Sequence, residues 1–202
     1  MKTIVLTVRG SSRIERVKSH LKSSGVQDYK LFYGISGARS GLQAGFTYDI
    51  DHPGSGYKIN DKHIGCSLSH WILWNHLEFV SRDSEDDYWM IVEDDVVFRD
   101  GWKQKVDEAM RDLPMHWDIL YAGHCCILDK IDGYVREGLL VARPFCTHCY
   151  IVRKKALPIL IEENEKIWAP IDIQMYFGSS KRLNTFAIFP RVADQDGTDI
   201  KD

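Results

Sequence analysis

The sequence predicts an α/β fold with a mainly parallel central sheet. Short apolar runs alternate with helix-like segments along the chain, which is typical of βαβ units. The length of 202 residues, with 44% hydrophobic and 27% charged residues, is close to the average for soluble globular domains. We therefore expect one domain over residues 1–202.

Seven runs rich in β-branched and aromatic residues are predicted to be strands. They cover residues 4–8, 30–35, 89–92, 118–122, 139–142, 149–152 and 186–189. After the first strand, Ser11 or Ser12 would cap a helix that ends at Gly25, because apolar residues recur there at intervals of three and four. These elements form a strand–helix–strand unit.

Three further segments have helical character. Residues 64–82 carry apolar side chains on two adjoining faces, so this helix should be mostly buried. Residues 100–113 form a helix that stops before Pro114, and residues 154–166 form another with Pro158 in its first turns. The glycine-rich residues 36–62 are predicted to be a long loop, either disordered or part of a binding site.

Charge and cysteine content limit the partners and the compartment. The formal net charge of −3 gives no overall positive field for nucleic acid, and no apolar run approaches the roughly 20 residues of a transmembrane helix. The five cysteines form an odd set, unlike a secreted disulfide framework. We expect a reducing, cytoplasmic compartment, with a peripheral position at a membrane surface and the oligomeric state left open.

The sharpest local signal is an apolar strand that runs directly into Glu93, Asp94 and Asp95. Three consecutive carboxylates at the edge of a sheet are costly to bury unless a cation is bound. Such oxygen ligands favour Mg²⁺ or Mn²⁺, which commonly bridge carboxylates to substrate phosphates. The alternative is a solvated turn.

The exit of the first strand offers contacts for a diphosphate. Thr7, Arg9, Arg13 and Arg16 lie at that exit or in the first turns of the following helix. Ligands of open α/β sheets bind outside the carboxyl ends of the strands, where arginine forks and a helix N-terminus suit phosphate groups. Surface arginines on a first helix are also common without any ligand.

Two other segments have both a structural and a functional interpretation. In the segment IGCSLSH, Gly65 permits close approach of a backbone or ligand, and Ser69 and His70 offer hydrogen bonds; an interior histidine is the structural alternative. Asp172 begins a predicted helix between Trp168 and Tyr176. It is either a helix cap or a general base for a sugar hydroxyl that stacks on the aromatic rings.

The cysteines could also suggest a zinc site. Cys146 and Cys149 have acceptable spacing for a ligand pair, but the adjacent Cys125 and Cys126 form a poor second pair. We therefore expect buried, small, apolar cysteines rather than metal ligands.

Taken in order, these segments resemble glycosyltransferase family 25, which includes bacterial lipooligosaccharide galactosyltransferases and procollagen galactosyltransferase domains. The resemblance covers nearly the whole chain. Its most specific parts are IGCSLSHWILW at 64–74, MIVEDDVVF at 90–98, DILYAG at 118–123, THCYIVRKKALPILI at 147–161 and API-Asp at 169–172.

The resemblance implies a GT-A-type (Rossmann-like) nucleotide-sugar-binding domain and an inverting transfer of a hexose, usually galactose or glucose. The donor would be a UDP-sugar, and the acceptor a hydroxyl on a glycan, a lipooligosaccharide or a protein. It assigns Asp95 and Glu93 to a Mn²⁺ or Mg²⁺ ion, with Asp94 beside them in the cofactor site. A catalytically inactive nucleotide-sugar-binding subunit is the alternative.

The same resemblance makes several residues candidates for donor binding. Arg9, Arg13 and Arg16 become candidates for UDP contacts, and Gly65, Ser69 and His70 candidates for the donor pocket. Ser36 stands where the family usually has an acidic residue, at the position of a predicted uridine or ribose contact. Thr198 replaces the usual serine of the C-terminal Ser-Asp-Ile segment.

Overall fold

The first 34 residues form the expected strand–helix–strand unit. In the computed structural model, which describes residues 1–37, 59–82, 84–125, 127 and 131–196, this unit comprises β1 (Lys2–Val8), α1 (Ile14–Ser23) and β2 (Tyr29–Gly34). The predicted serine cap of α1 is wrong: Arg13 occupies the N-cap position and makes no side-chain capping bond. The Ser11 hydroxyl is instead directed toward the carboxylates at the end of β3.

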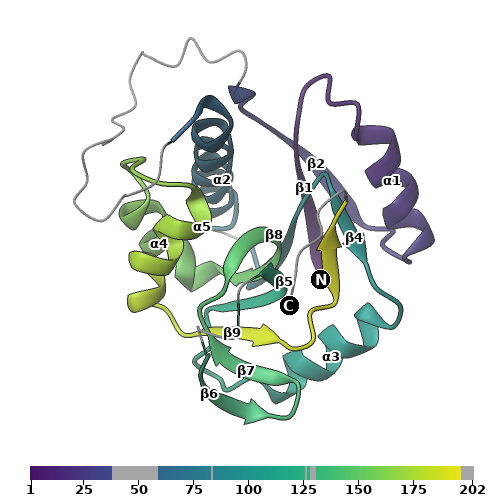
Figure 1. The fold of residues 1–202 in the computed structure, drawn as a ribbon, viewed down its shortest axis with the longest axis vertical. Helices are drawn as coiled ribbons and strands as arrows, with labels where there is room; N and C mark the ends of the chain where they lie inside the picture. Colours follow the sequence, from purple (N-terminus) through teal and green to yellow (C-terminus); the bar gives the residue numbers. More distant parts are fainter. Residues whose placement is uncertain (38–58, 83, 126, 128–130, 197–202) are drawn as a thin grey trace.

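The remaining elements follow the predicted alternation (Figure 1). They are α2 (Asp61–Val80), β3 (Tyr88–Glu93), β4 (Val96–Phe98), α3 (Trp102–Asp112), β5 (Ile119–Cys125), β6 (Ile131–Arg136), β7 (Leu139–Ala142), β8 (Phe145–Arg153), α4 (Leu157–Glu163), α5 (Ile171–Phe177), β9 (Thr185–Ile188) and β10 (Ala193–Gln195). All seven predicted strands are present. The sequence reasoning missed β4, β6 and β10.

The strands form one mixed sheet in the order β2-β1-β3-β8-β5-β9-β7-β6, with β4 and β10 off this path. β1 pairs in parallel with β2 and β3, and β5 with β9. β8 lies antiparallel between β3 and β5, so β2, β1, β3, β5 and β9 all run in one direction. The predicted α/β class with a mainly parallel sheet is confirmed.

Alternate residues of the central strands enter two separate hydrophobic cores. On β3, Met90 and Val92 pack into the core beneath α1 and α3, whereas Trp89 and Ile91 pack into the core beneath α2, α4 and α5. The helices therefore cover both faces of the sheet, as Figure 1 shows.

Two helices differ from the prediction in detail. Residues 154–166 are not one helix: Lys154–Ala156 form a 3₁₀ turn, and α4 then covers only Leu157–Glu163. Pro158 lies in the first turn of α4, where its missing N–H has no intrahelical partner to lose. The second difference is in α2, which begins at Asp61 instead of residue 64. Asn60 and His63 form a complete capping box at this start.

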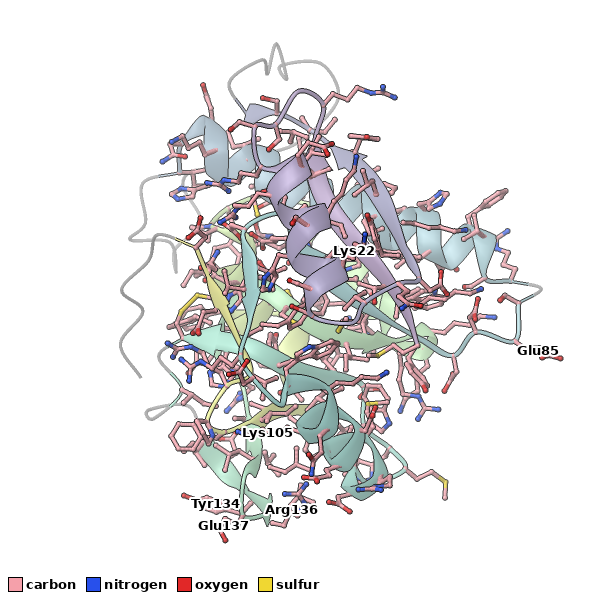
Figure 2. All side chains as sticks on the ribbon, turned by 90° about the vertical axis from the view of Figure 1, so that its right-hand side faces the viewer. Lys22, Glu85, Lys105, Tyr134, Arg136 and Glu137 are labelled. Atoms are coloured by element: carbon pink, nitrogen blue, oxygen red, sulfur yellow. A yellow bond between two sulfur atoms is a disulfide. The ribbon has the colours of Figure 1, made fainter. Side chains whose placement is uncertain are left out.

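The β6–β7 hairpin forms the outer edge of the sheet, away from β1. Figure 2 shows Tyr134, Arg136 and Glu137 at its outer tip, and the Tyr134 side chain is exposed. Among the described residues, no helix is long and apolar enough to cross a membrane. The predicted loop at 36–62 lies mostly outside the described residues, because only 36–37 and 59–62 are placed.

Candidate active site

The acidic triplet lies at the carboxyl end of β3, beside the end of β1. Glu93 is the last residue of β3 and pairs in register with Leu6 of β1, while Asp94 and Asp95 form the turn into β4. The parallel direction of β1 and β3 therefore brings the triplet next to the Thr7–Arg13 segment.

Asp94 is saturated with hydrogen bonds from the exit of β1. Its Oδ2 accepts from the Thr7 hydroxyl at 2.6 Å and from the Ser11 hydroxyl at 2.8 Å, and its Oδ1 lies 3.3 Å from Arg13 Nη1. Asp94 is buried. These contacts make Asp94 the anchor that attaches the triplet to the loop after β1.

The charge of the Asp95 carboxylate is only partly offset by neighbouring donors. Its Oδ2 lies 3.1 Å from Arg13 Nη1, but its buried Oδ1 has no hydrogen-bond partner among the described residues. Burial and the nearby Glu93 raise the pKa of Asp95 to about 6, although Arg13 and a hydrogen bond from the Gln195 side chain oppose the shift. A buried oxygen without a hydrogen-bond partner, on a carboxylate whose ionised form is disfavoured, fits the binding of a divalent cation at Asp95.

Glu93 is held in its ionised form by hydrogen-bond donors. Burial favours the neutral acid, but hydrogen bonds and charge from His70, together with the Thr147 hydroxyl, outweigh it and lower the Glu93 pKa. Thr147 Oγ1 donates to Glu93 Oε1 at 2.7 Å, and His70 Nε2 lies 3.3 Å from the same oxygen. His70 is itself fixed through Nδ1, 2.9 Å from the Tyr150 hydroxyl. Its position is buried, but it faces the triplet.

The three predicted arginines have different positions. Arg13 contacts both aspartates of the triplet. Arg16 donates to the backbone carbonyl of Asp94 at 3.3 Å and forms an ion pair with Asp196. Arg9 is exposed, with its guanidinium carbon 5.0 Å from the centre of the Tyr33 ring. Arg13 and Arg16 therefore contact the triplet, whereas Arg9 contacts Tyr33.

Gly65 and Ser69 support the segment that follows β2. A Cβ at Gly65 would lie 2.6 Å from the Gly37 nitrogen and 2.9 Å from the Ile35 carbonyl oxygen. The Ser69 hydroxyl accepts from the Ile35 N–H at 2.8 Å and donates to the Gly65 carbonyl at 2.6 Å. Ser36, in the segment held by this packing, lines the cleft beside the triplet. Gly65 and Ser69 therefore act by positioning that segment.

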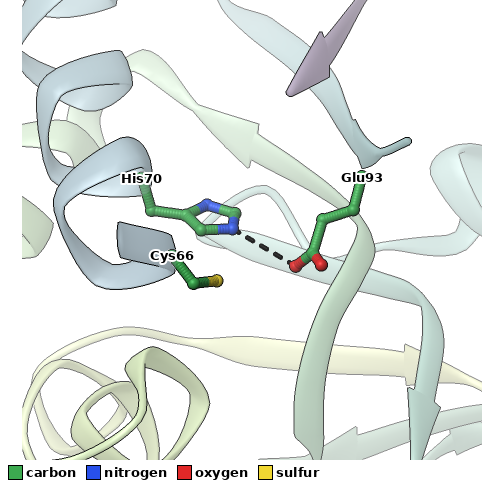
Figure 3. A group of neighbouring side chains, drawn as sticks. All are labelled: Cys66, His70 and Glu93. Carbon is green, nitrogen blue, oxygen red and sulfur yellow. Dashed lines mark hydrogen bonds and ion pairs between the residues drawn. The ribbon is translucent and has the colours of Figure 1, made fainter. Parts of the chain in front are cut away.

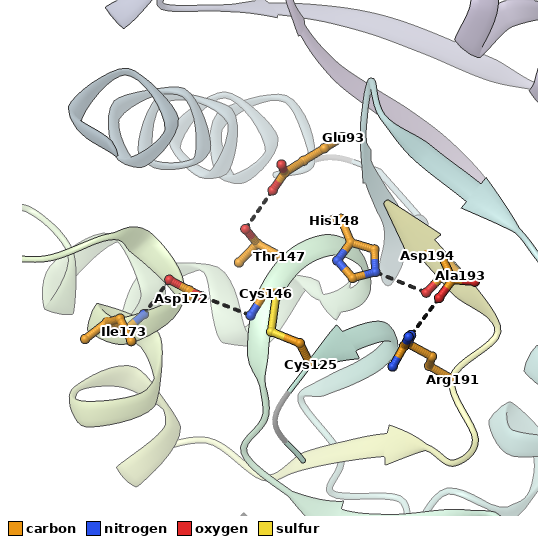
Figure 4. Close-up of a disulfide and its surroundings, with 10 residues drawn as sticks. All are labelled: Glu93, Cys125, Cys146, Thr147, His148, Asp172, Ile173, Arg191, Ala193 and Asp194. Atoms are coloured by element: carbon orange, nitrogen blue, oxygen red, sulfur yellow. Dashed lines mark hydrogen bonds and ion pairs between the residues drawn. A yellow bond between two sulfur atoms is a disulfide. The ribbon is translucent and has the colours of Figure 1, made fainter. Parts of the chain in front are cut away.

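Asp172 is not a helix cap. It lies in the first turn of α5, whose N-cap is Pro170 and lacks a side-chain capping bond. Its Oδ2 accepts the backbone N–H of Cys146 at 3.1 Å, and its Oδ1 accepts the N–H of Ile173 at 2.9 Å. Asp172 is therefore fixed against the start of β8 (Figure 4).

A disulfide joins Cys125, at the end of β5, to Cys146, at the start of β8 (Figure 4). The expectation that these cysteines are free, apolar side chains is wrong for this pair. Cys66 and Cys149 are free, and Cys126 lies outside the described residues. Spacing alone missed the bond because the two cysteines become neighbours only through the β5–β8 pairing, in which Cys125 aligns with Phe145.

Two clefts meet at this edge of the sheet. One, of about 410 Å³, is lined by Thr7, Ser11, Arg13 and Ser36, and the other, of about 440 Å³, by Asp172 and Thr147 among others. Cys66 and Glu93 line both clefts. A larger hollow of about 570 Å³ lies by β7 and β9 and contains none of the predicted site residues. The predicted site residues therefore make the two adjoining clefts, and not the larger hollow, the candidate active site.

Sequence reasoning assigned Ser11 to a helix cap and gave Thr147 and Cys66 no role at this edge. Ser11 supports Asp94, Thr147 supports Glu93, and Cys66 lines both clefts. Cys66 and Thr147 did belong to segments that carried the family resemblance. Their individual roles depend on strand pairing and helix rotation, which the sequence alone does not supply.

A helix-covered, mainly parallel sheet with carboxylates and arginines at its carboxyl edge defines an α/β domain whose ligand site lies outside the carboxyl ends of the strands. The chain belongs to glycosyltransferase family 25: the family model described as "Glycosyltransferase family 25 (LPS biosynthesis protein)" matches residues 4–175.

Curated relatives include proteins named as galactosyltransferases and proteins named as inactive members of this family. The chain is 32% identical over 95 residues to inactive glycosyltransferase 25 family member 3 of Mus musculus, covering 45% of the chain and 15% of that protein. It is 32% identical over 74 residues to procollagen galactosyltransferase 2 of Mus musculus, covering 35% of the chain and 11% of that protein. The chain thus spans less than a fifth of either relative.

Similarity to solved structures is more distant. A glycosyltransferase involved in the glycosylation of the major capsid of PBCV-1 aligns with a TM-score of 0.38 and 16% sequence identity, covering 78% of this chain and 62% of that chain. The family assignment rests on the sequence match.

Proposed function

We propose that this protein is a metal-dependent inverting glycosyltransferase that moves a hexose, galactose or glucose, from a UDP-sugar to an acceptor hydroxyl. The observation that carries the proposal is the buried, unpartnered Oδ1 of Asp95, beside the ionised Glu93. Both lie where β1 and β3 end, which is where α/β sheets bind nucleotides.

Asp95 and Glu93 would hold a hard divalent ion, Mn²⁺ or Mg²⁺, whose preferred ligands are oxygens. When bound, this ion would supply positive charge to the departing diphosphate. Arg13 adds a fixed positive charge at the same edge, because it already contacts Asp94 and Asp95. Stabilising charge where it develops on the leaving group is the main catalytic contribution expected of such residues.

The cleft beside the triplet is proposed to bind the donor. Thr7, Ser11 and Ser36 all line it. Ser36 offers a hydroxyl where a ribose or uracil group would lie. Arg16, which donates to the carbonyl of Asp94, would supply a second guanidinium to the diphosphate.

Asp172 is proposed to be the general base. It shares the second cleft with Glu93, and two backbone N–H groups fix its carboxylate. In an inverting transfer, a base of this kind accepts the proton of the attacking hydroxyl while the sugar–phosphate bond breaks.

Aromatic rings near Asp172 offer a surface for the acceptor. Tyr176 follows Asp172 by four residues on α5 and so lies on the same helical face. Its ring lies 5.1 Å from that of Phe145, between ring centres, and the guanidinium of Arg143 lies 5.7 Å from its centre. Such a surface suits the apolar face of an acceptor on a glycan, a lipooligosaccharide or a protein.

The second candidate function is a catalytically inactive nucleotide-sugar-binding subunit. Two observations favour this inactive subunit. One relative is named inactive glycosyltransferase 25 family member 3, and Ser36 stands in place of the usual acidic residue. The ordered carboxylates Glu93, Asp95 and Asp172 favour the enzyme.

Two variants separate the proposed roles. Asp95→Asn should abolish Mn²⁺-dependent UDP binding in calorimetry, whereas Asp172→Asn should bind UDP as tightly as the wild type but fail to transfer the hexose. Equal loss of UDP affinity in Asp172→Asn would place Asp172 in the donor site instead. Metal-dependent turnover by a folded Asp95→Asn protein would contradict the metal assignment.

A further inference from the structure

A thiol, an imidazole and a carboxylate converge where the two clefts meet (Figure 3). The Cys66 sulfur, one His70 nitrogen and one Glu93 oxygen all lie within 4.8 Å of one another. We propose that these three side chains form a binding site for a soft divalent cation of the Zn²⁺ class, which adjoins the hard-ion site at Asp95 and shares Glu93 with it.

The spacing and the donor types match such a cation. Cys66 and His70 are four residues apart on α2, so they lie one above the other on a single helical face. Glu93, at the end of β3, supplies the third donor from across the cleft. Three protein ligands with an open fourth position are typical of accessible zinc sites, and sulfur and imidazole donors select Zn²⁺ over Mg²⁺ or Mn²⁺.

The surroundings of His70 already orient it as a ligand. Its Nδ1 lies 2.9 Å from the Tyr150 hydroxyl, and the Trp74 indole donates to the same hydroxyl at 2.9 Å. This buried pair fixes the imidazole with Nε2 directed at Glu93. A hydrogen bond on the second ring nitrogen is the usual support of a metal-binding histidine.

The field at the sulfur also favours a cation. The carboxylate of Glu93 lies within 4.8 Å of the Cys66 sulfur, and Asp172 lines one of the two clefts that Cys66 also lines. A divalent ion would offset this negative charge. On binding, the sulfur–hydrogen bond would break heterolytically, the thiolate would ligate the ion and the proton would pass to solvent.

Because Glu93 belongs to both sites, the soft ion should inhibit the enzyme. Zn²⁺ would withdraw Glu93 from the Mn²⁺ or Mg²⁺ ion, and Asp95 alone would remain to hold that ion. This consequence rests on the proposed function, whereas the binding site itself does not.

Cobalt provides a direct test, because Co²⁺ bound to a thiolate gives a charge-transfer band in the near ultraviolet. We expect Co²⁺ titration of the metal-free, disulfide-intact protein to give this band, and Zn²⁺ to remove it by displacement. Cys66→Ser should abolish the band. The matched control is Cys149→Ser, which alters the other free cysteine among the described residues, a buried one, and should keep the band, as should Asp95→Asn.

Circular dichroism would establish that each variant is folded. No band in the folded wild type, or an unchanged band in Cys66→Ser, would overturn the proposed site. Absence of the band together with Mn²⁺-dependent UDP release would overturn this inference alone. The band without any UDP release or UDP binding would support it and overturn the proposed function.

Discussion

Thr147 donates its hydroxyl to Glu93 at 2.7 Å, across the junction between β8 and the end of β3. The residue before it, Cys146, donates its backbone N–H to Asp172 at 3.1 Å. Two consecutive residues at the start of β8 therefore hold a proposed metal ligand and the proposed base. Any displacement of this strand end should disturb both carboxylates together.

Thr147→Val should weaken metal binding without unfolding the protein. Valine has a similar shape, but it removes the donor that orients Glu93 and leaves His70 as the remaining side-chain donor recorded for Oε1. Loss of an outer-shell partner typically costs about 10–100-fold in metal affinity or activity. Calorimetric titration with Mn²⁺ measures the effect. Thr147→Ser keeps the hydroxyl and should bind nearly normally, whereas equal affinity in all three proteins would exclude the orienting role.

Asp95→Asn should stabilise the metal-free protein. The folded pKa of Asp95 is about 6, against an ordinary value of 3.8, so between these values the folded state holds the proton more tightly. The contribution of Asp95 to the free energy of unfolding therefore falls as pH rises from about 4 to about 6 and stays low above that. A shift of about two pKa units corresponds to about 3 kcal/mol.

Urea unfolding in EDTA at pH 4 and pH 7.5 measures this effect. The wild type should lose more stability than Asp95→Asn between the two pH values, and Mn²⁺ at pH 7.5 should restore stability to the wild type alone. If the free energy of unfolding changed equally with pH in the two proteins, ionisation of Asp95 would not destabilise the folded state.

Gly65→Ala should destabilise the fold and distort the wall of the donor cleft. The added methyl group would meet backbone atoms of Gly37 and Ile35 at 2.6–2.9 Å, a contact that neither α2 nor the segment after β2 can relieve by a rotamer change. Overpacking of this kind costs about 1–3 kcal/mol. Gly133→Ala is the matched control, because its added methyl group would meet only the Val141 side chain, at an ordinary 3.9 Å. Similar melting temperatures for both variants would argue against tight packing at Gly65.

Reduction of the Cys125–Cys146 disulfide should lower both stability and transfer activity. The bond closes a loop between residues 21 apart, for which chain entropy predicts a stabilisation of about 3 kcal/mol. It also adjoins the N–H that fixes Asp172, so transfer should fall more than UDP binding. Urea unfolding and activity with and without reductant measure the effects; a Cys125→Ala, Cys146→Ala protein that still responds to reductant would assign the response to another cysteine.

The strands and helices that could be predicted from the sequence are those with a strong apolar pattern of their own. The run at 89–92 is β3, and residues 64–82 are α2 with small differences at the ends. The exposed β6 escaped prediction because Asp132 and Gly133 interrupt its apolar pattern, and its pairing with β7 decides its conformation.

The candidate site divides in the same way. Glu93, Asp94, Asp95 and Arg13 could be found because they are close in sequence to strand ends whose parallel direction brings them together. Thr147 and the disulfide could not be found, because they depend on the antiparallel insertion of β8 between β3 and β5. No local pattern encodes that strand order.

The central claim is that the triplet forms a metal-dependent donor site for a UDP-sugar. UDP release from UDP-galactose, UDP-glucose and UDP-N-acetylglucosamine, measured with water as the acceptor in Mn²⁺ and in EDTA, tests it most directly. The account predicts slow release from one hexose in Mn²⁺ and none in EDTA or in Asp95→Asn. Undiminished release in EDTA, or neither release nor Mn²⁺-dependent UDP binding in the folded wild type, would contradict it.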